Sequence, residues 1–209
     1  MKNLKISDMS VTLRGESPLS GVPALVCYLE ESGKQYTASK FQKIVSQGVG
    51  EVITFVGKPF RQLKEVSNIL SLLNDKFVII ETSGRINKSN NKRSDIVPIV
   101  DRAAIVIKPT LDNINNGCYD WMLKYSFNCL YYKFVWQGDE DKTKELINLF
   151  FKKTNRSLYH EIENRRIMVI PNNIHDIDEC SDVWKYCLIN ELRYSGREFN
   201  RLFIKEDKK

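Results

Sequence analysis

The sequence lacks the closely spaced cysteines and histidines that hold metal ions in many proteins. Its five cysteines are widely and irregularly spaced, and no two have the two-residue gap of a zinc or redox site. Most of them stand among apolar neighbours, so we expect small buried side chains rather than ligands. The two histidines, His160 and His175, have no partner at a metal-binding spacing. The common zinc and redox motifs are therefore excluded.

The sequence also lacks long apolar runs. None approaches the roughly 20 residues of a membrane span, and the first residues lack the apolar core of a signal peptide. We therefore expect a cytoplasmic protein that does not bind membranes. With 209 residues, 28% of them charged and 42% hydrophobic, the composition is typical of one globular domain, expected to span residues 1–209.

A net charge of +6 allows an anionic partner but is mild. A basic patch of Lys88, Lys92 and Arg93 falls in a polar stretch expected to be a surface loop, where it could contact phosphates. A solvated charged surface is the interpretation we favour. No aromatic residues alternate with the basic ones as in a single-strand platform, so nucleic-acid binding has weak support.

Strand and helix patterns alternate along the chain with short connections. The alternation predicts an α/β fold with a mostly parallel sheet covered by helices, in which the carboxyl ends of the strands share one rim. Strands are expected at residues 22–29, 51–55, 77–80, 103–107, 130–136, 166–170 and near 201–204. Helices are expected from Ser39 to 46, at 61–73 and 119–126, from Asp139 or Asp141 to 153, and within 177–192.

Three motifs carry a resemblance to a known family. Arg14-Gly15-Glu16 precedes Gly21-Val22-Pro23-Ala24, Val56-Gly57-Lys58-Pro59 follows the second strand, and Glu81-Thr82-Ser83-Gly84 ends the third. In these motifs and their order the chain resembles the 7-carboxy-7-deazaguanine synthases (QueE), which are radical S-adenosylmethionine (SAM) enzymes of queuosine biosynthesis. The resemblance implies an incomplete parallel (β/α) barrel of radical SAM type with about six β-α units.

The resemblance also implies a [4Fe–4S] cluster, SAM and magnesium, but their ligands are missing here. The family binds its cluster through three thiolates at CxxxCxxC spacing. Ser32 stands at the first of these positions, and the other two have no counterpart. Lys58 replaces a family carboxylate that faces the amino group of SAM, which reverses the charge at that contact. We therefore expect no cofactor and no radical SAM activity, and we predict no catalytic or metal-binding residue.

Residual ligand-binding positions are predicted from the same motifs. They are Glu16, Gly57, Lys58, Glu81, Thr82 and Ser83. Each could instead have a structural role, since glycine shapes turns and Thr and Ser satisfy backbone groups at strand ends.

The sequence leaves several functions open. The favoured hypothesis is a catalytically inactive QueE-like protein that binds a protein partner or a second copy of itself. The alternative is a binder or enzyme of the queuosine/7-deazaguanine pathway that keeps a cleft for a pterin, a deazapurine or a nucleotide. A third hypothesis is an authentic synthase whose cluster ligands come from another chain.

Overall fold

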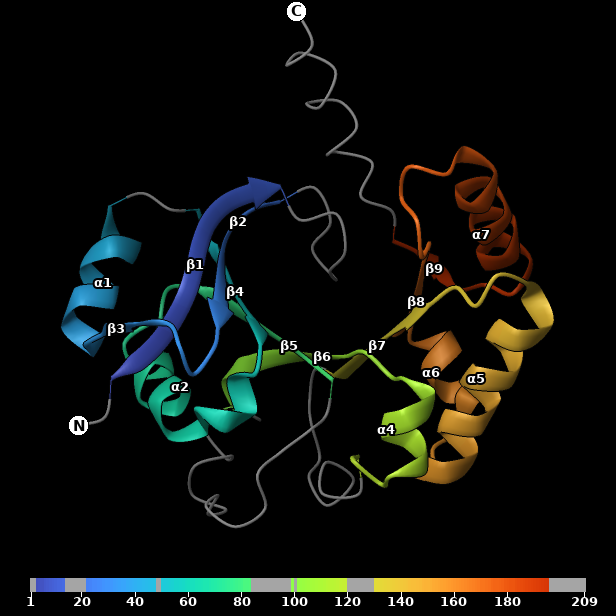
Figure 1. Cartoon of the computed structure of the whole chain (residues 1–209), viewed down its shortest axis with the longest axis horizontal. Coiled ribbons are helices and arrows are strands. Elements are labelled where there is room, and N and C mark those ends of the chain that lie inside the picture. Colours follow the sequence, from blue (N-terminus) through green and yellow to red (C-terminus); the bar gives the residue numbers. More distant parts are fainter. Residues whose placement is uncertain are drawn as a thin grey trace, which may run out of the picture. The chain divides into compact units, whose positions relative to one another are not determined.

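The computed structural model describes residues 3–13, 22–47, 50–83, 99, 101–119 and 130–195 (Figure 1). The chain divides into two compact units. The first comprises Met1–Thr12, Pro23–Ile107 and Cys118–Leu130, and the second comprises Leu13–Val22, Lys108–Gly117 and Tyr131–Lys209. Each unit is described by itself, and a single domain over residues 1–209 stays a prediction.

The first unit is a sheet with strand order β3-β1-β2-β4-β5-β6. Four of its strands run parallel, namely β2 (Pro23–Leu29), β4 (Val52–Gly57), β5 (Phe77–Thr82) and β6 (Ala103–Ile107). At the other edge, β3 (Lys34–Tyr36) pairs antiparallel with β1 (Leu4–Leu13). The parallel strands are nearly continuous runs of buried apolar residues, as expected for strands covered on both faces.

Two helices of this unit pack their apolar faces inward. In α1 (Ala38–Ser46), the Phe41 ring lies 5.9 Å from that of Phe55 on β4. The helix cap lies two residues earlier than predicted, because the Thr37 side chain, not that of Ser39, accepts the capping hydrogen bond from the backbone N–H of Lys40. A 3₁₀ turn, η1 (Pro59–Arg61), leads into α2 (Leu63–Leu70), which is shorter than predicted and buries Leu63, Val66, Ile69 and Leu70.

The second unit has three parallel strands in the order β7-β8-β9. They are β7 (Leu130–Val135, whose first residue belongs to the first unit), β8 (Ile167–Ile170) and β9 (Arg193–Tyr194). Its helices are α4 (Leu111–Asn115), α5 (Glu140–Thr154), α6 (Leu158–Glu163) and α7 (Ile177–Ile189), and Asp139 caps α5.

Helices α5 and α7 cover one face of these strands. The ring of Tyr132 on β7 lies 5.0 Å from that of Phe151 on α5, and the ring of Phe134 lies 5.7 Å from that of Phe150. Just after β7, the ring of Trp136 packs 5.4 Å from that of Tyr186 on α7. Side chains that alternate with Tyr132 and Phe134 therefore lie on the face away from these helices.

The predicted α/β class with a mostly parallel sheet is confirmed. Strands β4, β6, β7 and β8 are each followed by a helix, and β2 is followed by α1 after the short strand β3. This gives five of the six predicted β-α units within the described residues. The 85–93 segment, nearly all of the 119–126 helix and the 201–204 strand lie outside them. Among the described helices, none has the length and apolarity needed to cross a membrane.

Candidate functional site

The motif residues lie where the parallel strands of the first unit end. In the strand register, Leu29 at the end of β2 pairs with Gly57 at the end of β4, and Thr82 of β5 pairs with Ile107 of β6. The carboxyl ends of parallel strands meet at one edge of a sheet, and ligands of such sheets bind there. This edge is the candidate site.

Gly57 and Lys58 have an evident structural role at this edge. Gly57 has a φ of +92°, and a Cβ atom at this position would lie 2.8 Å from the carbonyl oxygen of Leu29. The next backbone N–H, that of Lys58, donates to the same oxygen at 3.0 Å. Only glycine fits this approach without strain, so the motif fixes the turn between β4 and η1. The Lys58 side chain is exposed.

The turn at residues 30–33 follows β2 and contains Ser32, the residue that the resemblance places at the first cluster position. The backbone N–H of Gly33 donates to the carbonyl of Glu30 at 3.1 Å, and the chain then enters β3. Gly33 lies against β1 so closely that a Cβ atom would come within 2.5 Å of the Ile6 carbonyl carbon. A hydrogen-bonded ion pair of 3.0 Å joins Glu31 to Arg61 of η1. The connection is therefore short and fixed at several points.

The donor set at this turn does not fit a [4Fe–4S] cluster. Such a cluster needs thiolates, and the turn offers carboxylate, hydroxyl and backbone groups only. Cys27 lies on the preceding strand with no exposed surface, and burial raises the pKa of its thiol to about 12. Within the described part of the chain, no three Cys, His, Asp or Glu side chains come together as a metal site.

The remaining motif residues divide between the site and parts that the structure does not describe. Glu81, Thr82 and Ser83 lie at the end of β5, with Thr82 buried and the other two half-buried. Because side chains alternate along a strand, Glu81 and Thr82 lie on opposite faces of the sheet. The edge thus brings together Gly57, Lys58, Glu81, Thr82 and Ser83. Glu16 and the basic patch of Lys88, Lys92 and Arg93 lie outside the described residues.

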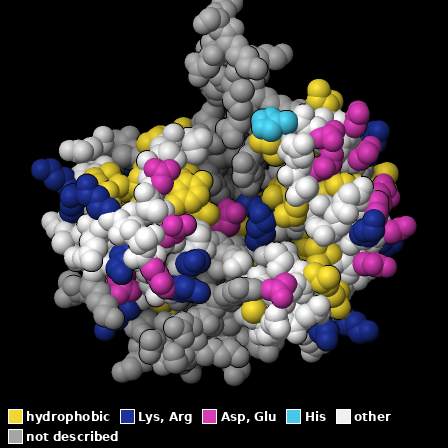
Figure 2. Space-filling model, viewed as in Figure 1, with side chains coloured by type: hydrophobic (Ala, Val, Ile, Leu, Met, Phe, Trp, Pro, Cys, Tyr) yellow, Lys and Arg dark blue, Asp and Glu magenta, His cyan; other side chains and the backbone are white. Residues whose placement is uncertain are grey.

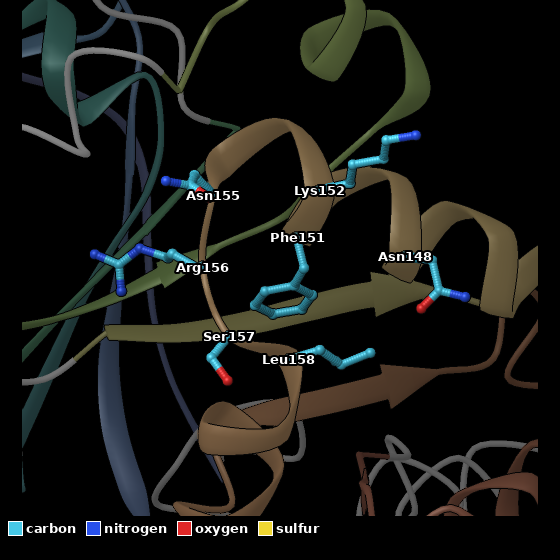
Figure 3. Close-up of a pocket in the computed structure, with 7 residues that line it drawn as sticks. All are labelled: Asn148, Phe151, Lys152, Asn155, Arg156, Ser157 and Leu158. Carbon is cyan, nitrogen blue, oxygen red and sulfur yellow. The ribbon is translucent and has the colours of Figure 1, made fainter.

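A separate hollow of about 600 Å³ lies in the second unit, where α5 turns into α6. Phe151, Leu158, Lys152 and Arg156 are among the residues that line it (Figure 3). Arg156 lies 3.3 Å from the buried carboxylate of Glu161, which a second arginine, Arg166, approaches at 3.4 Å. These charges therefore stabilise the helix connection and do not converge on a ligand.

Comparisons with solved structures report on the fold. The structure of QueE from Escherichia coli matches at a TM-score of 0.59 and 13% identity, over 92% of both chains. Streptococcus suis SuiB bound to precursor peptide SuiA matches at a TM-score of 0.50 and 11% identity, over 92% of this chain and 47% of that one. The chain has a QueE-like, radical SAM type of fold. No family model matches the sequence, and a search of curated proteins finds no match.

An exposed apolar surface lies on α7, for which the sequence predicts a helix but no exposed apolar face. Trp184 is 52% exposed, whereas Tyr186, two residues later, is buried. Acidic and hydrophobic side chains lie together over α7 (Figure 2). The apolar members of this α7 surface are Ile177, Trp184, Leu188 and Ile189. In the sequence, the signal for this surface is that Ile177, Trp184 and Leu188 are apolar and stand seven and four residues apart. This helical spacing is mixed with that of the apolar residues that α7 buries.

A buried lysine, Lys133, was missed altogether. It stands inside the aromatic run at residues 130–136, which the sequence indicates only as a buried strand, and its exposed fraction is 1%. A charged residue in the middle of a run expected to be buried was the available signal.

Proposed function

We propose that this chain is a binding protein built on a radical SAM type of fold and that it performs no radical chemistry. The observation that supports the proposal is the short turn at residues 30–33, which contains no cysteine and lies where the resemblance would put the cluster loop. Without a cluster, no electron reaches SAM, since that chemistry belongs to the cofactor. The structural neighbours support only the fold. The proposal that no cluster is bound therefore rests on the side chains available at this turn.

The α7 surface favours a protein as the bound partner, and a second copy of the chain fits it first. Large apolar side chains on one exposed helix face mark interaction sites. Asp178 and Asp182 lie toward the start of α7 and Lys185 lies nearer its end. Two α7 helices packed antiparallel would therefore bring opposite charges together while burying Trp184 and Leu188.

The mass of the particle in solution tests this surface. We expect light scattering after gel filtration to give twice the chain mass for the wild type and the monomer mass for Trp184→Glu with Leu188→Glu. Leu111→Glu is the control, because Leu111 is 57% exposed on α4. A monomeric wild type, or a double variant with unchanged mass, would count against the α7 surface.

A small-ligand binder is the second candidate. The grouping of Glu81, Thr82 and Ser83 at the carboxyl end of β5 favours it, because polar groups at strand ends orient ligands. Calorimetry against a panel of pterins, deazapurines and nucleotides would test this candidate. Heat of binding that Glu81→Gln reduces would support it, and no heat at millimolar ligand would reject it.

A further inference from the structure

A stripe of exposed and half-buried side chains runs along α7 with the spacing of a coiled-coil seam. Its members stand four, three and four residues apart, and they are Ile177, Ser181, Trp184 and Leu188. Steps of three and four residues alternate between the two seam positions of a heptad, whose side chains pack against a second helix. The stripe lies opposite Val183 and Cys187, which α7 buries. We call this stripe the α7 seam.

The α7 seam is complementary to itself when two copies run antiparallel. The steps of four, three and four residues read the same in both directions, so each seam position meets a seam position of the second helix. Ile177 then lies opposite the partner's Leu188. Trp184 lies opposite the partner's Ser181, whose small side chain leaves room for the indole ring. In a parallel pair, by contrast, two Trp184 side chains would compete for the same space.

Two charged side chains flank the α7 seam on one side. Asp178 and Lys185 each directly follow a seam residue and stand seven residues apart, so they lie along the same edge of the stripe. Both side chains are exposed. An antiparallel partner presents this edge in reverse, which brings Asp178 opposite the partner's Lys185. Because the arrangement is two-fold symmetric, the same ion pair forms twice.

The other charges of α7 favour the same orientation. Asp176 caps the helix, and Asp178 and Glu179 lie in its first turn, so a parallel pair would place two acidic ends together. Lys185 forms an ion pair with Asp182 of its own helix, but at 3.8 Å between two exposed groups this contact is weak. The ammonium group of Lys185 carries three donors, so it can bind a carboxylate of the partner as well.

We propose that α7 pairs with α7 of a second copy in this one antiparallel register, and that Asp178 and Lys185 determine it. This register rests on the proposed function, since it specifies how the α7 surface recognises a second copy. The apolar side chains supply the contact, and the two ion pairs select the partner and its orientation. An apolar helix that places no basic residue opposite Asp178 would be a poorer partner.

Charge reversal at the two flanking positions tests the register. Lys185→Glu makes both facing pairs acidic, and Asp178→Lys makes both basic. We expect each variant alone to dimerise about tenfold or more weakly than the wild type, measured by sedimentation velocity over a range of concentrations. An equimolar mixture of the two variants should dimerise within about threefold of the wild type, because both facing pairs then combine opposite charges.

Lys144→Glu is the matched control, because it makes the same charge change at an exposed position of α5 and should dimerise within about twofold of the wild type. Circular dichroism should show every variant folded, and Lys185→Glu carries the test alone where Asp178→Lys is misfolded. Unchanged dimerisation in the reversal variants, or a mixture as weak as they are, would overturn the register. If Trp184→Glu with Leu188→Glu still abolished the dimer, the α7 surface would stand without it. A wild type that is monomeric at every concentration would overturn both.

Discussion

At the scale of single residues, the backbone geometry at two positions explains why glycine is required there. Gly57 sits at a φ of +92° against the carbonyl of Leu29, and Gly33 lies against the backbone of β1. Gly57 belongs to a stretch that the sequence associates with a ligand site, and Gly33 follows the position of the missing cluster ligand. Their geometry shows that such motifs are used by the fold whether or not a ligand is bound.

Gly57→Ala should destabilise the protein by about 2–4 kcal/mol, since it adds both an unfavourable φ and a Cβ atom 2.8 Å from the Leu29 carbonyl oxygen. Gly138 is a matched control, because its φ is +93° and a Cβ atom there would meet nothing within 4 Å. Urea unfolding of Gly57→Ala and Gly138→Ala measures the difference. Equal losses in the two variants would show that the contact with Leu29 adds nothing.

Burial of Cys27 predicts a loss of stability at high pH. Its pKa rises from 9.0 to about 12 in the folded chain because burial disfavours the thiolate. The stabilisation is complete below the pKa of the unfolded thiol, and it is lost as the pH rises from 9.0 toward about 12. Urea unfolding at about pH 8 and about pH 11 should show a smaller decrease for Cys27→Val than for wild type. Equal decreases would mean that the Cys27 thiol ionises as readily in the folded chain as in the unfolded one.

At the scale of elements, side chains replace missing strand partners. The amide of Gln62, 7% exposed, donates to the carbonyl of Lys5 at 2.9 Å and accepts from its N–H at 2.6 Å. It thereby satisfies both polar groups of one residue of β1. These two hydrogen bonds of the Gln62 side chain link β1 to the start of α2.

Gln62→Leu should destabilise the chain by about 2–3 kcal/mol, because it leaves two part-buried backbone groups without hydrogen bonds. Gln47→Leu changes an exposed glutamine and should cost under about 0.5 kcal/mol. Denaturant unfolding gives both values, and hydrogen exchange at the Lys5 amide should be faster in Gln62→Leu only. An unchanged exchange rate at Lys5 would contradict this role for Gln62.

The elements also show what a single sequence can predict. Apolar runs such as Ala103–Ile107 predict buried parallel strands, because a strand covered on both faces needs no alternation. By contrast, β3 has three residues and no apolar pattern, and it forms because Gly33 lets the turn lie against β1. The short helix α6, capped by Ser157, could not be predicted from an apolar pattern either.

At the scale of the whole molecule, the same type of fold occurs with a very different sequence. The structure matches QueE over 92% of both chains at 13% identity. A sheet of this kind requires buried strands, amphipathic helices and a few turn glycines, and many sequences satisfy these conditions. The cluster requires three thiolates at fixed spacing, and no other residue type satisfies that condition. A chain can therefore satisfy the conditions for this fold without the residues that bind the cluster.

Anaerobic reconstitution with iron and sulfide tests the central claim most directly, with QueE from Escherichia coli treated in parallel. After desalting, we expect a colourless protein without bound iron and without the visible absorption of an iron–sulfur cluster. Unfolding by urea, measured on the same sample, should be the same before and after treatment, because no ligand has been added to the fold. A brown protein holding about four irons per chain would contradict the account.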